Sequence, residues 1–177
     1  DADVGYAEFM TVPAAFAHPI PDGLGDTHAA PLLCAGAIGY RSLRLSDIDD
    51  GQRIGLTGFG ASAHLVLKLA AFTLPETPIY VFARSPEQRE FALELGAVWA
   101  GGTADEPPEL LDAIIDTTPA WKPVVEGLGA LAPGGRLVVN AIRKEAGDQA
   151  YLQKLDYPKH LWMEKEIKSV ANVVRRD

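Results

Sequence analysis

The stretch RIGLTGFGASAHLVLKLAAF, residues 53–72, decides the fold. Its first apolar run, 54–57, is short and leads into glycines, which predicts a buried strand. Residues 62–72 are apolar on almost every side, interrupted only by His64 and Lys68, and this predicts a deeply packed helix. A buried strand, a glycine-rich turn and a buried helix in this order indicate the first unit of a doubly wound parallel sheet.

The glycine-rich turn matches the pattern G-x-G-x-x-(G/A). Its positions are Gly58, Phe59, Gly60, Ala61, Ser62 and Ala63. The first glycine permits the tight turn, the second lets the backbone approach a pyrophosphate, and the small third position lets the helix pack against the strand. The free N–H groups and the dipole of the helix would then face the phosphates. We expect this turn to bind a dinucleotide; the alternative is a tight turn in a sheet protein that binds nothing.

β-rich and helical runs continue to alternate along the chain, which predicts βαβ units and an α/β fold. We expect further strands at 79–82, 97–100, 113–117, 136–140 and 166–174. Helices are expected at 29–45, 86–95 and 121–131, whereas 143–162 stays undecided. Ser85 is predicted to cap the helix that begins at Pro86, with Gln88 completing a capping box and Gly96 ending the helix.

The second strand runs into Ala83-Arg84-Ser85. In NAD-binding proteins an acidic residue about 20 positions past the glycines bonds the ribose 2′-hydroxyl, and here that position is Ala83. No carboxylate stands there to repel a 2′-phosphate, and Arg84 and Ser85 can bind one through charge-assisted hydrogen bonds. The sequence therefore favours NADP(H) over NAD(H). The alternative is that Arg84 is a solvated charge and Ser85 only a helix cap.

Composition narrows the class of protein further. The chain has 177 residues, 47% of them apolar, and a net charge of −8, so it gives no electrostatic reason to bind nucleic acid or an anionic membrane. It shows neither a membrane-spanning apolar stretch nor the plan of a signal peptide. Cys34 is the one cysteine, which excludes an intrachain disulfide and fits a reducing compartment such as the cytoplasm. The four histidines lack a metal-binding spacing, and we expect the tryptophans in the core: Trp99, Trp121 and Trp162.

Several strings spread along the chain are more distinctive than the glycine turn. They are GYAEFMTV, HPIPDGL, AAPLLCAG, GYRSLR, RIGLTGFGASAH, ELGAVWAG and SVANVVRRD. Together they resemble the medium-chain zinc alcohol dehydrogenases, especially the bacterial and cinnamyl-alcohol types. The resemblance implies a Rossmann domain at 26–177 with strand order 3-2-1-4-5-6. It also implies that residues 1–25 are the last stretch of a GroES-like catalytic domain.

The resemblance implies an oxidoreductase that moves hydride between NADP(H) and a primary alcohol or aldehyde, with zinc polarising the substrate oxygen. It places Cys34 as the last catalytic zinc ligand, with the other ligands upstream of this chain. We therefore expect neither bound zinc nor turnover from this chain alone, and no catalytic residue within it. Ile38 stands where many relatives have a threonine, which puts a hydroxyl relay there in doubt. Members often pair through their nucleotide domains, so a homo-oligomer stays open.

The nicotinamide end is expected where the later strands end, because ligands lie beyond the carboxyl ends of parallel strands. By resemblance the pocket is lined by Thr117, Thr118, Asn140, Ala141, Ile142, Ala171 and Asn172. For each of these residues the alternative is ordinary packing at a strand end. Two other functions stay open: a nucleotide-sensing module without chemistry, and a zinc-free enzyme resembling quinone reductases.

Overall fold

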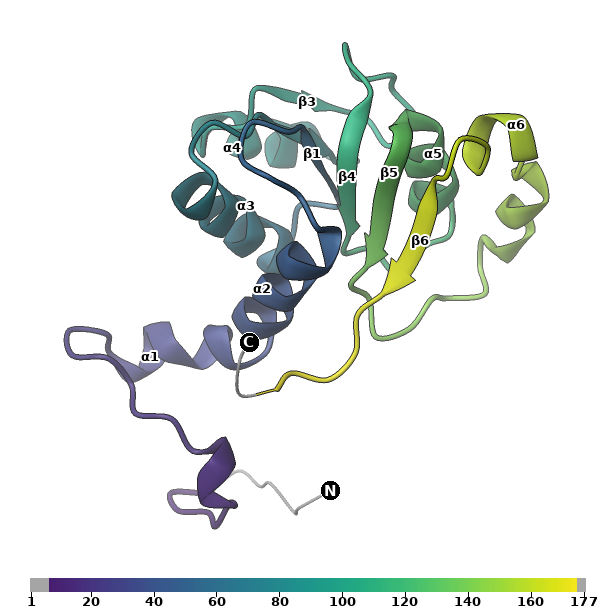
Figure 1. Ribbon diagram of the computed structural model, residues 1–177. Coiled ribbons are helices and arrows are strands. Elements are labelled where there is room, and N and C mark those ends of the chain that lie inside the picture. Colours follow the sequence, from purple (N-terminus) through teal and green to yellow (C-terminus); the bar gives the residue numbers. More distant parts are fainter. Residues whose placement is uncertain (1–6, 175–177) are drawn as a thin grey trace.

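A six-stranded parallel sheet forms the centre of the computed structural model, which describes residues 7–174 (Figure 1). The strand order is β3-β2-β1-β4-β5-β6, and every neighbouring pair is parallel. The strands are β1 (Ile54–Thr57), β2 (Ile79–Phe82), β3 (Trp99–Gly101), β4 (Leu111–Asp116), β5 (Leu131–Val139) and β6 (Glu166–Ser169). The α/β class and the doubly wound order are confirmed. The order reverses between β1 and β4, and in sheets of this kind ligands bind outside the carboxyl ends of the strands at such a point.

Helices cover both faces of this sheet. On one face α2 (Ala35–Ser46), α3 (Ala61–Thr73) and α4 (Pro86–Glu94) pack over a core that includes Ile54, Leu56 and Val81. On the other face α5 (Lys122–Ala130) packs over Ile114 and Leu137. Strands β1 and β2 are buried along their whole length, as strands covered on both faces must be.

Shorter helices occupy the two ends of the chain. They are η1 (Ala14–Phe16), α1 (Asp26–Ala29), η2 (Ala30–Leu33), η3 (Gln149–Lys154) and α6 (Tyr157–His160). The last two fall in the segment that the sequence left undecided. Figure 1 shows the chain before α2 reaching away from the sheet.

The helix expected at 29–45 is interrupted at Cys34, where α2 begins. Pro31 follows the start of η2, and the backbone of Cys34 leaves ideal helical geometry with φ −114° and ψ −73°. Within α2, Gly39 is needed for packing rather than for a turn. A Cβ on Gly39 would lie 2.8 Å from Cγ2 of Val66, so the missing side chain lets α2 approach α3 closely.

Several expected strand limits were wrong. β3 begins at Trp99 rather than Ala97, and β4 spans Leu111–Asp116 rather than 113–117. β5 begins at Leu131, not Arg136, because Leu131 already pairs with Leu111. The register then shifts across residues 132–135 before Arg136 pairs with Ala113. β6 ends at Ser169, well before 174, because its partner β5 ends at Val139.

The tryptophans differ in their surroundings. Trp99 packs edge-on against Phe82 with ring centroids 5.1 Å apart, and Trp121 is half-buried beside the same core. Trp162 is 54% exposed, so the expectation of core packing was wrong for it. It follows the short helix α6 and packs edge-on against Tyr157, which is itself exposed. Within residues 7–174, no helix combines the length and apolar character needed to cross a membrane.

We predict that Gly135→Ala destabilises the fold by about 1–3 kcal/mol, the usual cost of overpacking. A Cβ there would lie 2.8 Å from the carbonyl oxygen of Ala132 and within 3.2 Å of those of Leu111 and Asp112, and none of these can move away without distorting the sheet. Gly147→Ala is the matched control, since its Cβ would meet no atom of residues 7–174 within 4 Å. Urea unfolding measures both variants, and equal midpoints would contradict the prediction.

Candidate functional site

Gly58 directly follows β1 and sits where a side chain cannot fit. Its φ is +76°, and an added Cβ would lie 2.8 Å from Cγ2 of Thr118 and 3.1 Å from Oγ1 of Thr117. Its N–H donates to the carbonyl of Phe82 at the end of β2. The turn is thus wedged between the ends of β2 and β4. A glycine is required here for both conformation and space.

A glycine stands at the second position of the turn, Gly60, for a different reason. An added Cβ on Gly60 would meet no atom of residues 7–174 within 4 Å, so the space over this backbone is open. Gly60 is also the N-cap of α3, and no side chain in the described part of the chain caps that helix. The first N–H groups of a helix lack acceptors within it, so they face this open space together with the positive end of the dipole. The arrangement fits a pyrophosphate.

Two other positions of the turn, Phe59 and Ala63, are structural. Ala63 is fully buried, as the small third position of the pattern requires. Phe59 is only 4% exposed and packs edge-on against Phe91 of α4. Ala61 is exposed and Ser62 half-buried, so both lie at the rim of the open space.

At the end of β2, Ala83 is buried and Arg84 is exposed. The Ser85 hydroxyl accepts a hydrogen bond from the N–H of Gln88 at 3.2 Å, so the predicted N-cap is confirmed. The same hydroxyl donates to Oε2 of Glu87 at 2.6 Å, and this bond lowers the pKa of Glu87. Ser85 is therefore engaged within α4. Arg84, in contrast, is exposed, so its positive charge faces solvent.

The expected nicotinamide residues divide into two groups. Thr117, Thr118 and Asn140 lie together at the carboxyl ends of β4 and β5. Asn140 is 8% exposed, its N–H donates to the carbonyl of Asp116, and its Nδ2 finds no hydrogen-bond partner among residues 7–174. Ala141 is half-buried, whereas Ile142 is 98% exposed. Ala171 and Asn172 are exposed beyond β6.

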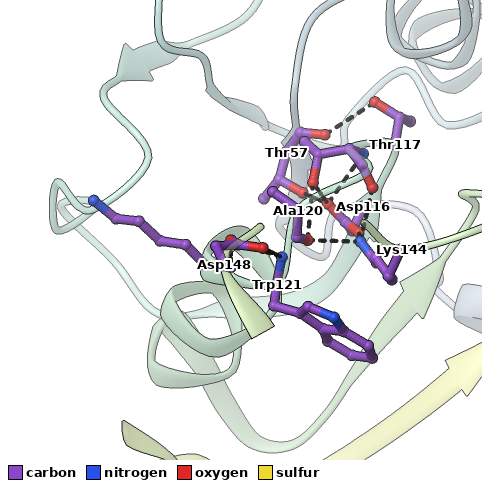
Figure 2. A network of polar contacts seen from close by, with 9 residues as sticks. Thr57, Asp116, Thr117, Ala120, Trp121, Lys144 and Asp148 are labelled. Atoms are coloured by element: carbon purple, nitrogen blue, oxygen red, sulfur yellow. Dashed lines mark hydrogen bonds and ion pairs between the residues drawn. The ribbon is translucent and has the colours of Figure 1, made fainter. Parts of the chain in front are cut away.

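Sequence reasoning missed a buried ion pair at this edge of the sheet (Figure 2). Asp116 ends β4 with a fully buried side chain, and its Oδ2 accepts from the ammonium group of Lys144, which is 8% exposed. The hydroxyl of Thr57, which ends β1, donates to Oδ1 of Asp116 at 2.6 Å. No local motif signals this pair, because its members are far apart in the chain and Lys144 lies in a polar segment.

Asp148 holds the same loop to helix α5. Its carboxylate accepts from the N–H of Trp121 at 2.9 Å and from that of Lys122 at 2.8 Å, as Figure 2 shows in part. It thus caps a helix whose own N-cap residue makes no side-chain cap bond. Burial raises the pKa of Asp148, but the two N–H donors outweigh it and leave that pKa below its usual value.

A metal centre is not assembled by the described residues. Within residues 7–174, no three His, Cys, Asp or Glu side chains lie close enough together to hold a metal ion. Cys34 is exposed at the start of α2. The residues from 7 to 174 therefore do not by themselves fit a zinc ion.

No family model matches the chain. Curated proteins do match it: alcohol dehydrogenase AdhA of Mycobacterium tuberculosis is 46% identical over all 177 residues, which cover 49% of that protein. A cinnamyl alcohol dehydrogenase of Populus deltoides is 34% identical over 145 residues, 78% of this chain and 40% of its own length. The chain thus spans about half the length of the curated relatives it matches.

Solved structures share the fold. The CAD of Helicobacter pylori, in complex with NADP(H), superposes with a TM-score of 0.67 at 23% identity, over 83% of this chain and 41% of that one. A glycine-turn Rossmann sheet with its phosphate helix defines a dinucleotide-binding class of fold. The chain is thus similar in sequence to alcohol dehydrogenases, over its full length in the case of AdhA, and similar in fold to a solved CAD.

We predict that Asp148→Ala lowers the free energy of unfolding by about 1 kcal/mol at neutral pH, as loss of a helix cap does. Because the folded pKa is lowered, this stabilisation is present above the usual value of 3.8 and fades as the pH falls below it. The difference between wild type and variant should therefore shrink on acidification. Urea unfolding at neutral pH and near pH 3 measures it, and a difference that does not shrink would refute the role given to the carboxylate.

Proposed function

We propose that this chain is the cofactor-binding part of an alcohol dehydrogenase and that it binds NADP(H) in preference to NAD(H). The observation that carries the proposal is the open space over Gly60 at the uncapped start of α3. Its backbone N–H groups would hold the pyrophosphate. From there the adenosine half would extend toward Arg84 at the end of β2, and the nicotinamide half toward Thr118 and Asn140.

The cofactor, when bound, supplies the hydride chemistry between an alcohol and its aldehyde. The residues of this chain bind and orient it. The backbone N–H groups of the glycine turn would donate hydrogen bonds to the pyrophosphate, and the buried Phe59 and Ala63 hold that turn in place. The unpaired Nδ2 of Asn140 is a hydrogen-bond donor at the nicotinamide end. Ala141 and Ile142, with Ala171 and Asn172, would form the outer wall of the same end.

Preference for a 2′-phosphate rests on Arg84. The side chain is exposed, and the buried neighbour Ala83 provides no carboxylate to repel the phosphate. Ser85 contributes less than the sequence suggested, because its hydroxyl is engaged with Glu87 and with the N–H of Gln88.

Residues 1–25 we assign to the end of a catalytic domain of GroES-like type, and 26–177 to the nucleotide-binding domain. The described part of the first segment carries exposed apolar side chains, among them Phe9 (89% exposed) and Phe16 (69%). Side chains of this kind are expected to be covered in a complete protein. Cys34 would be one zinc ligand there, completed by residues of the catalytic domain, and a primary alcohol or aldehyde would be the substrate. The place of action we propose is the cytoplasm.

The proposal is tested by calorimetric titration with NADPH and NADH. Wild type should bind NADPH more tightly, and Arg84→Ala should lose about 1–3 kcal/mol of that preference, roughly five- to 150-fold in affinity. Lys168→Ala removes an equal charge from exposed strand β6 and should leave the preference intact. If the cofactors bind equally to wild type, or the preference survives Arg84→Ala, the specificity proposal is wrong. If a folded full-length protein binds neither, cofactor binding itself is wrong.

Glu87 should weaken NADPH binding, because its carboxylate is bonded to Ser85 beside the proposed phosphate position. Glu87→Gln keeps an oxygen that can accept from Ser85 but removes the charge. We expect the variant to bind NADPH roughly two- to fivefold more tightly, the scale of an exposed charge interaction, with NADH unaffected. The gain should shrink at high salt. An NADPH affinity that is unchanged or lower would place the 2′-phosphate away from Ser85.

A further inference from the structure

We propose that Asp116 and Lys144 act as a positioning pair that holds the nicotinamide half of the cofactor site in shape. This inference rests on the proposed function, because it assigns a role within the same site. Neither residue belongs to the glycine turn or to the 2′-phosphate region. Their contacts, seen in Figure 2, join three separate segments at the carboxyl edge of the sheet.

The ammonium group of Lys144 uses all three of its donors. It pairs with Oδ2 of Asp116 and donates to the carbonyl oxygens of Thr118 at 2.8 Å and Ala120 at 3.0 Å. The acceptors belong to the end of β4 and the loop after it, whereas Lys144 follows β5. The cation therefore ties the loop after β5 to the loop after β4.

The other oxygen of the Asp116 carboxylate, Oδ1, accepts three further hydrogen bonds. It accepts from the Thr57 hydroxyl at 2.6 Å, and from the hydroxyl and N–H of Thr118 at 2.8 and 3.2 Å. Thr57 immediately precedes Gly58, and the Thr118 methyl is the atom that a Cβ on Gly58 would strike. Asp116 thus holds Thr118, which lies beside the glycine turn, through contacts that do not involve Lys144.

A purely structural need does not account for charges at this place. Burying an ion pair is costly, and well-packed apolar side chains of similar volume stabilise a core equally well or better. A buried network that is fully hydrogen-bonded does give one defined arrangement. Here the network fixes the arrangement of Thr117, Thr118 and the start of the loop at Asn140.

The loop after β5 needs such an anchor. Of its residues, Ile142, Arg143 and Glu145 are exposed, while Lys144 turns inward. The N–H of Glu145 donates to the carbonyl of Pro119 at 2.7 Å, which closes the loop beside the ion pair. Loss of Lys144 would loosen the start of this loop, which Glu145 and Asp148 would still hold further along, while the glycine turn and the Arg84 region keep their own contacts.

The test compares two probes in the full-length protein: NADPH, and adenosine 2′,5′-bisphosphate, which lacks the nicotinamide half. Lys144→Met should weaken NADPH binding roughly ten- to hundredfold, as the loss of a coupled neighbour can do. Binding of the bisphosphate should change little. Lys154→Met is the matched control, because it removes the same charge from an exposed side chain over the ring of Tyr151 and should alter neither affinity.

Asp116→Asn is the second variant, for use where Lys144→Met does not fold. It keeps the shape of the side chain and should weaken NADPH selectively, to a smaller extent. The inference is overturned if the variants bind both probes more weakly by equal factors, if neither affinity changes, or if wild type binds NADPH no more tightly than the bisphosphate. Wild type that binds neither probe overturns the proposed function, and this inference with it.

Discussion

The close approach of Gly58 to the threonines at the end of β4 is the contact on which the site depends. With φ +76° and no Cβ, the turn after β1 can lie against Thr117 and Thr118. Directly beneath this contact, Thr57 and Asp116 are joined by a buried hydrogen bond. The backbone of the following residues is then free to face outward at the start of α3. The open space proposed for the phosphate and the buried polar network thus both depend on this packing contact.

Charge is distributed so that an acidic protein can hold an anion. The chain carries a net charge of −8, yet the carboxylate of Asp116, which accepts from Thr57 just before the glycine turn, is paired with Lys144. The proposed phosphate position is formed by backbone N–H groups, which need no counter-charge of their own. Glu87 does not follow this arrangement, because its carboxylate stays charged beside the proposed 2′-phosphate position.

Much of the fold could be predicted because local patterns determine it. Strands 54–57 and 79–82 are short apolar runs bounded by turns, as strands buried on both faces are, and the limits of both were correct. The cap at Ser85 is likewise a local pattern. The start of β5 was missed because its first pair, Leu131 with Leu111, depends on a register shift that leaves no periodic signal. The break at Cys34 also escaped prediction, since the residues on both sides favour a helix.

The candidate site was predictable only where a motif exists. The glycine turn has a pattern because each position meets a backbone requirement. The Asp116–Lys144 pair and the Asp148 cap have none, since their partners lie more than 20 residues apart and meet only when the carboxyl ends of β4 and β5 come together. The bond of Ser85 to Glu87 escaped prediction for a related reason: it depends on side-chain geometry that the sequence does not encode as a motif.

We propose that the start of α3 binds the pyrophosphate of a dinucleotide, and a crystal structure of the protein grown with NADPH would show whether it does. We expect phosphate oxygens within hydrogen-bond distance of the N–H groups at Ala61 and Ser62, the 2′-phosphate beside Arg84, and the nicotinamide toward Thr118 and Asn140. Electron density for the cofactor at another place, with the space over Gly60 filled only by water, would contradict it.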